Sequence, residues 1–490
     1  MTNNSGLRAM PYRTGGLFLL VAGLAALFLA AAPSTTAQVR LSKIGDTVVD
    51  NSALTFPPNS PFGSAINGLA FQQDAVHTAL GWQYVAYYDS RRHVAVARRH
   101  LPKGAWESIH FMDYDFKSID AHNVISLGIC EQDGTIHLAF DHHVSPLHYR
   151  ASRPGVATHP GDIKWDTSLF GPIHQDLEAG KPIVITYPRF WSTKNGGLQM
   201  NYRRGSSGSG DSMLVDYNPA TGTWTNTRQI DSGTGNFQDE LGPNNHRNAY
   251  PNGYDYDATG RLHTTWVWRE NSQGSNHDLN YDYSDDGGKT WFTDSDQPIV
   301  GPASIDTPGL VVEHISRRQG LMNNHAQAID SQNRIHAVMW YSTSTTTLTA
   351  KGTELWGPPA DRRYHHYWRE AAGKWHDDLL PWVAGSRPRL FVDDHDNLIL
   401  IYGRLSIDES MQGGIYSPGD LVIAVATAKN RWLDWKIAVE EMGPFINEML
   451  GDPTRWKAER ILSVMVQQTP RTLGTPSPLR VIDYRWSDAP

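Results

Sequence analysis

A turn followed by a strand recurs along the whole chain, and this repeat constrains the fold more than any other feature. Clear copies are EQDGTIHLAF (131–140), DATGRLHTTWVW (257–268), DSQNRIHAVMWY (330–341) and DDHDNLILIY (393–402), with weaker copies at 194–202 and near residues 81 and 459. Markers placed at turn positions 81, 134, 196, 260, 333, 397 and 459 are 53 to 73 residues apart. Each interval has room for four strands and their loops. The repeat predicts an all-β, seven-bladed β-propeller, with six or eight blades as alternatives because the first and last copies are weak.

Further motifs agree with this fold. Ser284–Trp291 (SDDGGKTW) fits the Asp box, a structural turn that carries no catalytic meaning. Leu479–Trp486 (LRVIDYRW) is strand-like, and we predict that it completes the first blade and closes the ring. The single cysteine, Cys130, excludes an intramolecular disulfide, and its position within a predicted strand indicates packing.

The N-terminus has the pattern of a secretory signal peptide. Arg8 and Arg13 precede an apolar run over residues 16–32, and small residues lead to a cleavage site after Ala37. A single membrane anchor is the alternative, although the run is short for a span. We therefore expect a signal peptide over 1–37 and one secreted or periplasmic domain over 38–490. After cleavage this domain is expected to be a monomer without a membrane segment.

The open ends of the hairpins carry the candidate functional residues. Folding each hairpin about its turn gives these facing pairs: His122 with His143, Tyr187 with Arg203, Tyr250 with Arg269, His325 with Tyr341, and Arg389 with Arg404. Equivalent positions of successive blades surround one end of the central channel. Apart from Tyr341, these residues and His142 are therefore predicted to share one rim.

The charges at this rim predict an anionic ligand. The whole chain carries a net charge of −8, which argues against nucleic acid as a partner. Several arginines nevertheless gather at the rim, and a guanidinium group matches a carboxylate or sulfate in bidentate fashion. The alternative is that these arginines pair with Asp141, Asp89 or Glu270 and only stiffen the rim.

Histidine and tyrosine beside arginine suit β-elimination on a uronic acid. Arginine would neutralise the carboxylate, a base would remove the C5 proton, and an acid would protonate the departing O4. His142 and Tyr187, on neighbouring blades, are the candidates for the two proton transfers. A sialidase-type hydrolase would need paired carboxylates at the strand ends, and we find none there.

A metal site is the competing use for the clustered histidines. His122, His142 and His143 with Asp141 could bind zinc or another transition metal. Adjacent residues on a strand point to opposite sides, so only one of His142 and His143 is expected to join such a cluster. The elimination chemistry itself requires no cofactor.

Four segments also carry a family resemblance. HNVISLGICEQDGTIHLAFDHH (122–143), ITYPRFW (185–191), MNYRRGSSGSG (200–210) and TTWVWRE (264–270) resemble the BNR-repeat polysaccharide lyases. These are seven-bladed propellers that include ulvan lyases and rhamnosyl-α-1,4-glucuronate lyases acting on gum arabic. The resemblance covers most of the chain after the signal peptide and is strongest from His122 to Trp291.

The resemblance implies roles for individual residues. His142 and Tyr187 match proton-transfer positions, without fixing which is base and which acid, whereas His122 and Arg203 match carboxylate recognition. Tyr250 matches an assisting or sugar-contacting position. The other substrate-binding candidates rest on the rim argument: Arg269, His143, Arg404 and His325. Relatives also have a structural calcium, for which no ligand set is found in this sequence.

Together these observations predict an exported lyase that cleaves a glycosidic bond to glucuronate or iduronate in a rhamnose-containing anionic polysaccharide such as ulvan. A rhamnosyl-α-1,4-glucuronate lyase of the same fold is the first alternative. A non-catalytic carbohydrate-binding propeller and a sialidase-type hydrolase are alternatives of other classes.

Overall fold

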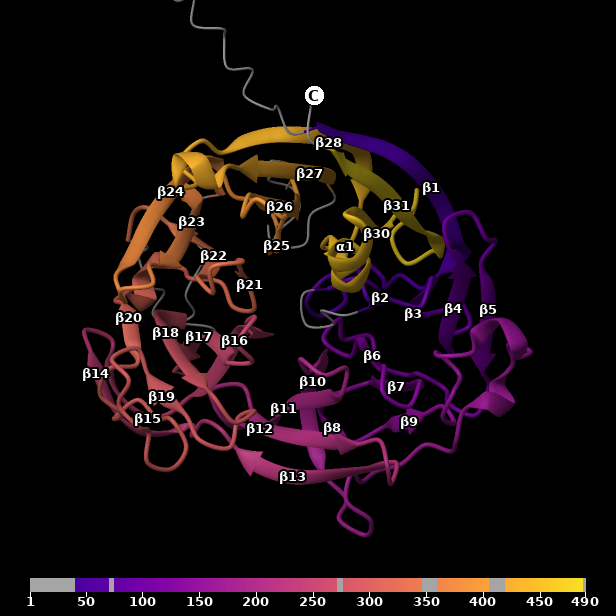
Figure 1. Cartoon of the computed structure of the whole chain (residues 1–490), viewed down its shortest axis with the longest axis horizontal. Coiled ribbons are helices and arrows are strands. Elements are labelled where there is room, and N and C mark those ends of the chain that lie inside the picture. The colour runs from indigo at the N-terminus through magenta and orange to yellow at the C-terminus, as the bar shows by residue number, and fades with distance from the viewer. Residues whose placement is uncertain (1–39, 70–74, 271–275, 346–358, 405–418, 488–490) are drawn as a thin grey trace, which may run out of the picture. The chain divides into compact units, whose positions relative to one another are not determined.

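Antiparallel β-sheets stand around a central channel in the structure, a computed structural model that describes residues 40–69, 75–270, 276–345, 359–404 and 419–487 (Figure 1). Within these ranges seven sheets form the blades of a β-propeller, as the repeat predicted. The predicted signal peptide over 1–37 lies outside the described residues and stays a prediction.

The first four blades, each written from its innermost strand outward, follow the chain. They are β2–β5 (Val76–Ala79, Trp82–Tyr88, Val94–His100, Glu107–Phe111); β6, β7 and β9 (Ile125–Cys130, Thr135–Phe140, Tyr149–Ala151); β10–β13 (Val184–Ser192, Leu198–Ser206, Ser209–Asn218, Thr223–Gln229), with β8 (His143–Pro146) paired to β10; and β16–β19 (Asn248–Tyr256, Leu262–Arg269, Asn276–Ser284, Phe292–Thr293), with β20 (Val311–Glu313) paired to β18.

The other three blades complete the ring. They are β21–β24 (Ala326–Ile329, Ile335–Ser342, Arg362–Arg369, Trp375–Val383); β25–β28 (Arg389–Val392, Leu398–Gly403, Gly419–Ala426, Lys436–Phe445); and β29, β30, β31 and β1 (Leu450–Gly451, Ile461–Gln467, Ser477–Ser487, Arg40–Ala53). A separate hairpin is formed by β14 (Thr234–Asp239) and β15 (Gly242–His246).

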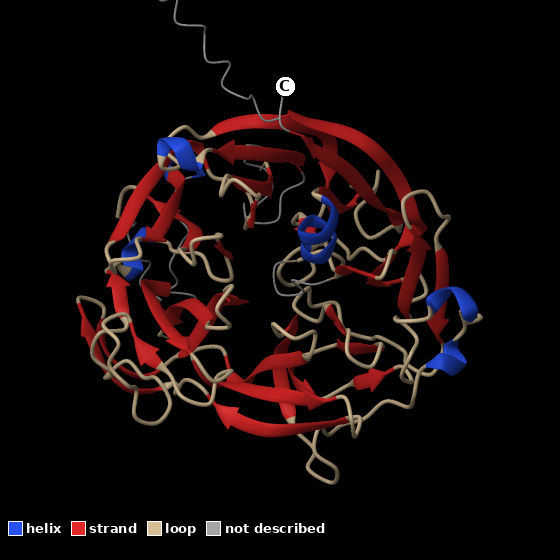
Figure 2. Cartoon of the chain, in the orientation of Figure 1, coloured by secondary structure: helices blue, strands red, loops and turns tan. Residues whose placement is uncertain are grey.

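Helical turns are few in the described chain, and Figure 2 shows that most of them lie at the periphery. The one α-helix there, α1 (Pro453–Glu459), connects β29 to β30 and faces the channel (Figure 2). The 3-10 turns span Pro160–Asp162, Thr167–Leu169, Arg317–Gln319, Pro359–Asp361 and Ala428–Asn430.

All seven predicted markers lie between the innermost strand of a blade and the next strand. In four of the seven segments an aspartate explains the turn, because its carboxylate accepts hydrogen bonds from nearby backbone N–H groups. Asp257 Oδ1 accepts from Thr259, Gly260 and Arg261 at 2.8–2.9 Å, and Asp330 Oδ1 accepts from Gln332 and Arg334 at 2.9 Å each.

The predicted strand register is confirmed in the second blade, confirmed in the third blade only between its bulge and its turn (Arg189 pairs with Asn201), and wrong in the next three. Ile125 pairs with Phe140, which places the hairpin centre between residues 132 and 133 as expected. In the third blade a bulge after Thr186 moves Arg203 opposite Thr186 instead of Tyr187. The next three blades differ by two or three positions: Asn248 pairs with Arg269, Ala326 with Val338, and Arg389 with Ile401.

Ring closure runs opposite to the prediction. We expected the C-terminal strand to complete the first blade, but β31 stays in the last blade, where the N-terminal strand β1 joins it from Arg40↔Ser487 to Ala53↔Ser477. Arg99 on β4 then bridges the first and last blades. Its Nη2 donates to both carboxylate oxygens of Asp483 at 3.0 and 2.8 Å, and its Nη1 donates to Thr47 Oγ1 at 2.9 Å.

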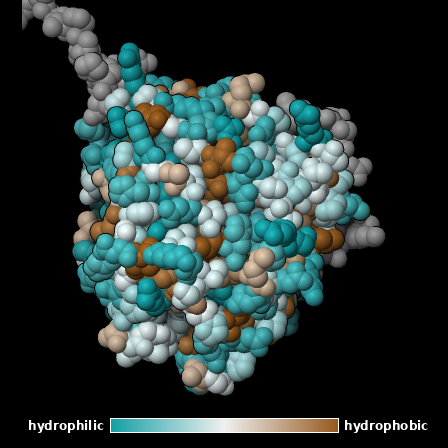
Figure 3. All heavy atoms as spheres, turned by 90° about the vertical axis from the view of Figure 1, so that its right-hand side faces the viewer, coloured by the Kyte–Doolittle hydropathy of each residue, from teal (hydrophilic) through white to brown (hydrophobic). Residues whose placement is uncertain are grey.

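Apolar side chains fill the spaces between neighbouring sheets. The Asp box makes one such contact, because Trp291 packs in a buried cluster with Leu214 of the preceding blade. Asp286 Oδ1 holds the turn by accepting from the N–H groups of Lys289 and Thr290 at 3.0 and 2.9 Å. The face shown in Figure 3 is mostly hydrophilic with small, separate apolar spots. Across the described residues we find no helix long and apolar enough to span a bilayer.

Candidate active site

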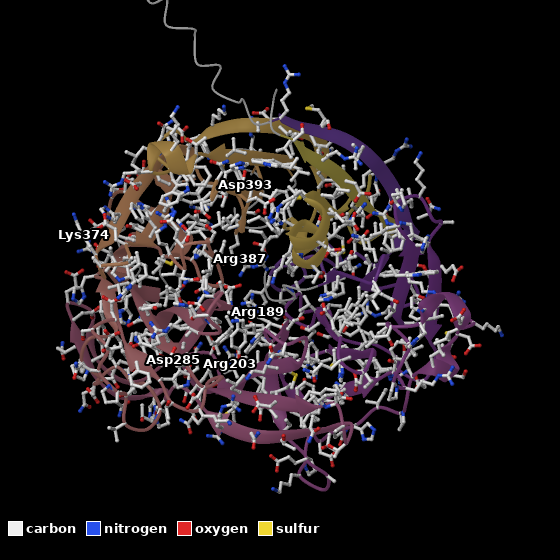
Figure 4. All side chains as sticks on the ribbon, in the orientation of Figure 1. Arg189, Arg203, Asp285, Lys374, Arg387 and Asp393 are labelled. Atoms are coloured by element: carbon white, nitrogen blue, oxygen red, sulfur yellow. The ribbon has the colours of Figure 1, made fainter. Side chains whose placement is uncertain are left out.

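The candidate site lies where the loops and strand starts of several blades reach the channel. Figure 4 places Arg189, Arg203 and Arg387 on the channel side of the ring and Lys374 at its outer edge. A pocket here is lined in part by Tyr187, Arg189, Arg203, Tyr250 and Asn324.

A carboxylate bridges two histidines at one side of the site. Asp120 Oδ1 lies 2.5 Å from His122 Nδ1, and Asp120 Oδ2 lies 2.7 Å from His143 Nδ1. The two imidazole rings stack with centroids 4.3 Å apart. Phe62, half exposed, places its ring 4.0 Å from the His122 ring. The bridge fixes the orientation of both rings, as a carboxylate hydrogen-bonded to one ring nitrogen does for functional histidines.

Tyrosine and arginine continue the site from these histidines. The ring of Tyr187 lies 5.8 Å from His122 and 6.1 Å from His143. The guanidinium carbon of Arg203 lies 5.1 Å from the Tyr187 ring, and Arg203 Nη1 donates to the hydroxyl of Tyr250 at 3.1 Å. These residues therefore form one continuous group across three blades.

Arg203 is poised to bind a further acceptor. It is 5% exposed, and its Nε and Nη2 atoms have no hydrogen-bond partner within the described part of the chain. A buried guanidinium with two unused donors is costly unless an anion or polar group completes it. The geometry therefore suits a carboxylate that enters from the channel.

Strained backbone also occurs at and beside the same residues. The φ values are 64°, 62°, 57° and 52° for Phe62, Asp141, Val144 and Tyr187. They lie in the left-handed region, which residues other than glycine rarely adopt. For Tyr187 this conformation coincides with the β10 bulge that displaces the predicted pairing. Such strain is held in place by surrounding structure and gathers at functional sites.

Burial and charge move the pKa values of the site. Burial lowers the pKa of His122 to about 4, although the Asp120 carboxylate opposes this shift. Burial alone would raise the pKa of Asp120, but its hydrogen bonds to His122 and His143 outweigh this and hold the pKa below its usual range. At neutral pH His122 is thus a neutral imidazole beside an ionised carboxylate.

Tyr250 has the most unusual environment of the group. Burial would raise the pKa of its phenol, but Arg269 and Arg203 outweigh that effect and lower the pKa to about 7. Arg269 contributes through its guanidinium carbon, 4.9 Å from the Tyr250 ring centroid. Arg269 therefore joins the site, although its backbone pairs with Asn248 and not with Tyr250.

Three predicted rim residues do not reach this group. His142 is 1% exposed, and its Nε2 accepts the backbone N–H of His148 at 2.9 Å. His325 is buried and its Nε2 accepts the backbone N–H of Trp340 at 3.1 Å. Arg404 pairs with Glu440 on the outermost strand β28. Within the described residues none of these three side chains makes a contact with the group, so their predicted roles in the site stay predictions.

Neighbouring residues that we did not predict complete the site. Asp120 carries a readable signal, because an aspartate two residues before His122 can cap its backbone, and His122 N donates to Asp120 Oδ1 at 3.0 Å. Arg387 lowers the pKa of His122 from the sixth blade and donates through Nε to Glu448 Oε1 at 2.7 Å. Phe62 comes from a loop that no repeat marks.

The histidine cluster is also a candidate metal centre. Metal-binding side chains are those of histidine, cysteine, aspartate and glutamate. Within the described ranges the single group of three whose donor atoms lie within 4.8 Å of one another is Asp120, His122 and His143. Two nitrogens and one oxygen suit zinc better than calcium, which prefers oxygen ligands. The same atoms already form a hydrogen-bonded triad, so the cluster is internally complete as a proton-handling group.

Comparison with known proteins places this geometry in context. The model of the BNR repeat-containing family matches residues 82–382. The long isoform of ulvan lyase from Pseudoalteromonas sp. (strain PLSV) is 25% identical over 291 residues, which are 49% of this chain. The chain spans 28% of the length of that relative.

Two solved structures share the fold. The crystal structure of polysaccharide lyase Uly1 has a TM-score of 0.70 at 16% identity and covers 90% of this chain and 99% of its own. A PL25 ulvan lyase bound to -[GlcA(1-4)Rha3S]- has a TM-score of 0.61 at 13% identity, covering 91% and 96%. With the family match extending over more than half of its residues, this propeller belongs to the BNR repeat-containing family.

Proposed function

We propose that this protein is a polysaccharide lyase that cleaves a glycosidic bond to a uronic acid by β-elimination. The observation that carries the proposal is Arg203, a buried guanidinium with two unpartnered donors, set beside Tyr187 and the His122–His143 pair. This arrangement combines a carboxylate receptor with groups that exchange protons.

Arg203 would bind the uronate carboxylate through Nε and Nη2. Charge-assisted, bidentate hydrogen bonds of this kind are strong and directional. They also withdraw charge from the carboxylate, which makes the proton on C5 more acidic and stabilises the carbanion-like transition state.

Proton transfer at C5 and at O4 falls to the residues beside Arg203. Tyr187 keeps its implied role in proton transfer and His122 its implied role in carboxylate recognition. His143 supports them in place of His142, because its ring, not that of His142, stacks against His122 and Tyr187. In the reaction the C5–H bond breaks, its electron pair forms the C4–C5 double bond, and O4 leaves with the C4–O4 pair and gains a proton.

The substrate class follows from the relatives and from the charges of the pocket. A related propeller binds a glucuronate–rhamnose 3-sulfate chain, and another relative is an ulvan lyase. We therefore propose a rhamnose-containing uronate polysaccharide, with ulvan as first choice and a rhamnosyl-glucuronate side chain as second. Export from the cytoplasm, as the N-terminal pattern predicts, would bring the enzyme to such a polymer.

A digestion assay tests the proposal. β-Elimination creates an unsaturated uronate with strong ultraviolet absorbance, so purified protein should raise that absorbance on ulvan or on a rhamnosyl-glucuronate polymer. Tyr187→Phe should reduce the rate at least about 100-fold, as expected for a proton-transfer group. New reducing ends without ultraviolet absorbance would indicate a hydrolase, and tight binding without cleavage would indicate a carbohydrate-binding propeller.

The proposed chemistry needs no cofactor. Activity is expected to survive dialysis against a chelator, since Arg203 supplies the positive charge that a metal ion would otherwise provide. A lasting loss of activity that zinc restores would instead assign Asp120, His122 and His143 to a metal.

A further inference from the structure

Tyr250 lies between two arginines in the interior of the site. It belongs to β16, is 3% exposed, and accepts a hydrogen bond from Arg203 Nη1 at 3.1 Å. Arg269 lies over the ring, with its guanidinium carbon 4.9 Å from the ring centroid. Ser207 Oγ, 3.5 Å away, is a further neighbour of the hydroxyl.

Neither arginine has an ion-pair partner in the described part of the chain. Arg203 makes its one described side-chain hydrogen bond to the Tyr250 hydroxyl, whereas Arg269 Nε donates to the neutral amide oxygen of Asn276 at 2.9 Å. Two cations, of which Arg203 is buried and Arg269 partly buried, favour an anion in contact with both. Among the described neighbours, the Tyr250 phenol is the acidic group in contact with both.

The pocket around Tyr250 is lined by no acidic side chain of the described chain, and Arg189 on β10 adds a third cation to it. The ring of Tyr187 on β10 lies 6.2 Å from that of Tyr250. Leu279 on β18 and Met339 and Tyr341 on β22 share a buried cluster with Tyr250, and burial raises the pKa of Tyr341, which keeps it neutral. Arg203 on β11 and Arg269 on β17 are the charged groups in contact with this phenol, in agreement with its lowered pKa of about 7.

We propose that Tyr250 is the catalytic base of the elimination, held as a phenolate between Arg203 and Arg269. The inference rests on the proposed function and goes beyond it by assigning the proton at C5 to one atom. A uronate would bind Arg203 Nε and Nη2 through its carboxylate, and the C5 atom is bonded directly to that carboxylate carbon. The third nitrogen of the same guanidinium, Nη1, already donates to the Tyr250 oxygen.

The step balances in charge and in protons. The C5–H bond breaks and the proton moves to the Tyr250 oxygen, while the electron pair becomes the C4–C5 double bond. The C4–O4 bond breaks with its pair on O4, and Tyr187 supplies the proton to O4. Before the step two guanidinium groups face two anions, the phenolate and the substrate carboxylate. During the step the phenolate loses its negative charge while negative charge builds up on the carboxylate, so the arginines remain neutralised.

Ultraviolet titration of the protein without substrate tests the ionisation directly. In the wild type one tyrosine should ionise near neutral pH, well below the ordinary value of about 10. Tyr250→Phe should remove this transition. Tyr256→Phe, which deletes a hydroxyl on the same strand that donates to Gln199, should retain it. A wild type without a transition below about pH 9, or a transition that persists in Tyr250→Phe, overturns the proposal.

A second variant keeps the test independent of how Tyr250→Phe folds. Arg269→Gln leaves the phenol in place and removes one of its two cations, so the transition should move up by about one pH unit or more. The acid limb of the kcat/KM profile should move up by the same amount, because the base must be ionised to react. An unmoved transition overturns the proposal.

Kinetics separate a base from a binding residue. Tyr250→Phe should lower kcat at least about 100-fold with little change in KM. A rise in KM with kcat unchanged would overturn the role as base. If the wild type cleaves no polysaccharide while the neutral titration is present and vanishes in Tyr250→Phe, the proposed function fails but the phenolate stands, so the two failures are distinguishable.

Discussion

At the scale of single residues, His142 and His143 show that a shift of one position along the chain decides whether a histidine side chain reaches the candidate site. The two are neighbours in sequence, but His142 accepts a backbone hydrogen bond in the blade interior whereas His143 shares Asp120 with His122. Alternation along a strand predicts that only one of them faces the site. It does not say which one, because the left-handed φ of Asp141 redirects the chain just before the pair.

Substitution of each histidine should therefore give different losses. His143→Ala should lower kcat/KM about 100-fold or more and leave thermal stability nearly unchanged, since the ring is partly exposed. His142→Ala should lower the free energy of unfolding by about 1–3 kcal/mol, because it orphans the His148 N–H and opens a cavity. Steady-state kinetics and urea unfolding measure both. If His143→Ala and His142→Ala lost the same activity and had the same free energy of unfolding, the assignment of His143 to the site and of His142 to the blade interior would be contradicted.

At the scale of strands and blades, three histidines of the repeat are structural. In TIH, RLH and RIH of the second, fourth and fifth blades, the imidazole joins the turn region to the third strand of its blade. His137 contacts Thr135 and Tyr149, His263 contacts Asp257 and Tyr281, and His336 contacts Asp330 and His366. Position within the repeat, more than residue type, separates these histidines from those of the site.

Turns were predictable from sequence, whereas registers were not. An aspartate that caps backbone N–H groups marks four of the seven turns, and a glycine with positive φ marks those at Gly81 and Gly196, so these turns could be found. The register depends on where the turn is centred and on bulges. The Asp330–Arg334 turn is centred one residue before the marker Asn333, and the Tyr187 bulge adds a residue to β10. Such shifts arise from tertiary packing and leave no sequence motif.

The contact between the third and fourth blades contains two buried acids. Asp231 and Asp282 line a small pocket with Trp266, and the Asp282 Oδ1 and Trp266 Nε1 atoms have no hydrogen-bond partner in the described chain. Burial raises the pKa of Asp231 to about 7 and that of Asp282 well above its usual range. A raised carboxyl pKa in the folded state means that stability falls as pH rises from about 4 to about 7.

Asp231→Asn should remove much of this pH dependence. The variant should be more stable than the wild type at about pH 8, by roughly 1–4 kcal/mol. The difference should become small near pH 4, where the wild-type carboxyl is largely protonated in the folded chain and close to its pKa in the unfolded chain. Urea unfolding at both pH values measures it. Asp115→Asn, at an exposed carboxylate, is the matched control and should differ from wild type at neither pH. A variant less stable than the wild type at the higher pH would contradict the interpretation.

At the scale of the whole molecule, the ring depends on a strand borrowed from the start of the chain. β1 covers the edge of β31, and Val49 and Ala53 of β1 are buried in the joint. The strand-like character of residues 479–486 could be read from the sequence. The blade that it belongs to could not, because closure depends on which free edge remains once the other sheets have formed.

Deleting β1 should open the ring. A chain that begins at Leu54 should unfold at a clearly lower temperature than one that begins at Arg40, and it should associate, because an uncovered strand edge pairs with other chains. Replacing the β14–β15 hairpin by a short glycine linker removes a similar length outside the blades and should leave a monomer. Thermal unfolding and light scattering after size exclusion measure both. A monodisperse, equally stable deletion variant would contradict the role of β1.

The pairing of β1 with β31 also sets the order of events during synthesis. Among the described strands β1 leaves the ribosome before all others and its partner β31 leaves after them, since Arg40 pairs with Ser487. While the blades between them are synthesised, the nascent chain therefore carries an extended segment whose N–H and C=O groups have no sheet to join. A holding factor that shields this segment until Ser487 has emerged would raise the yield of native protein, and slowing translation would prolong the vulnerable interval.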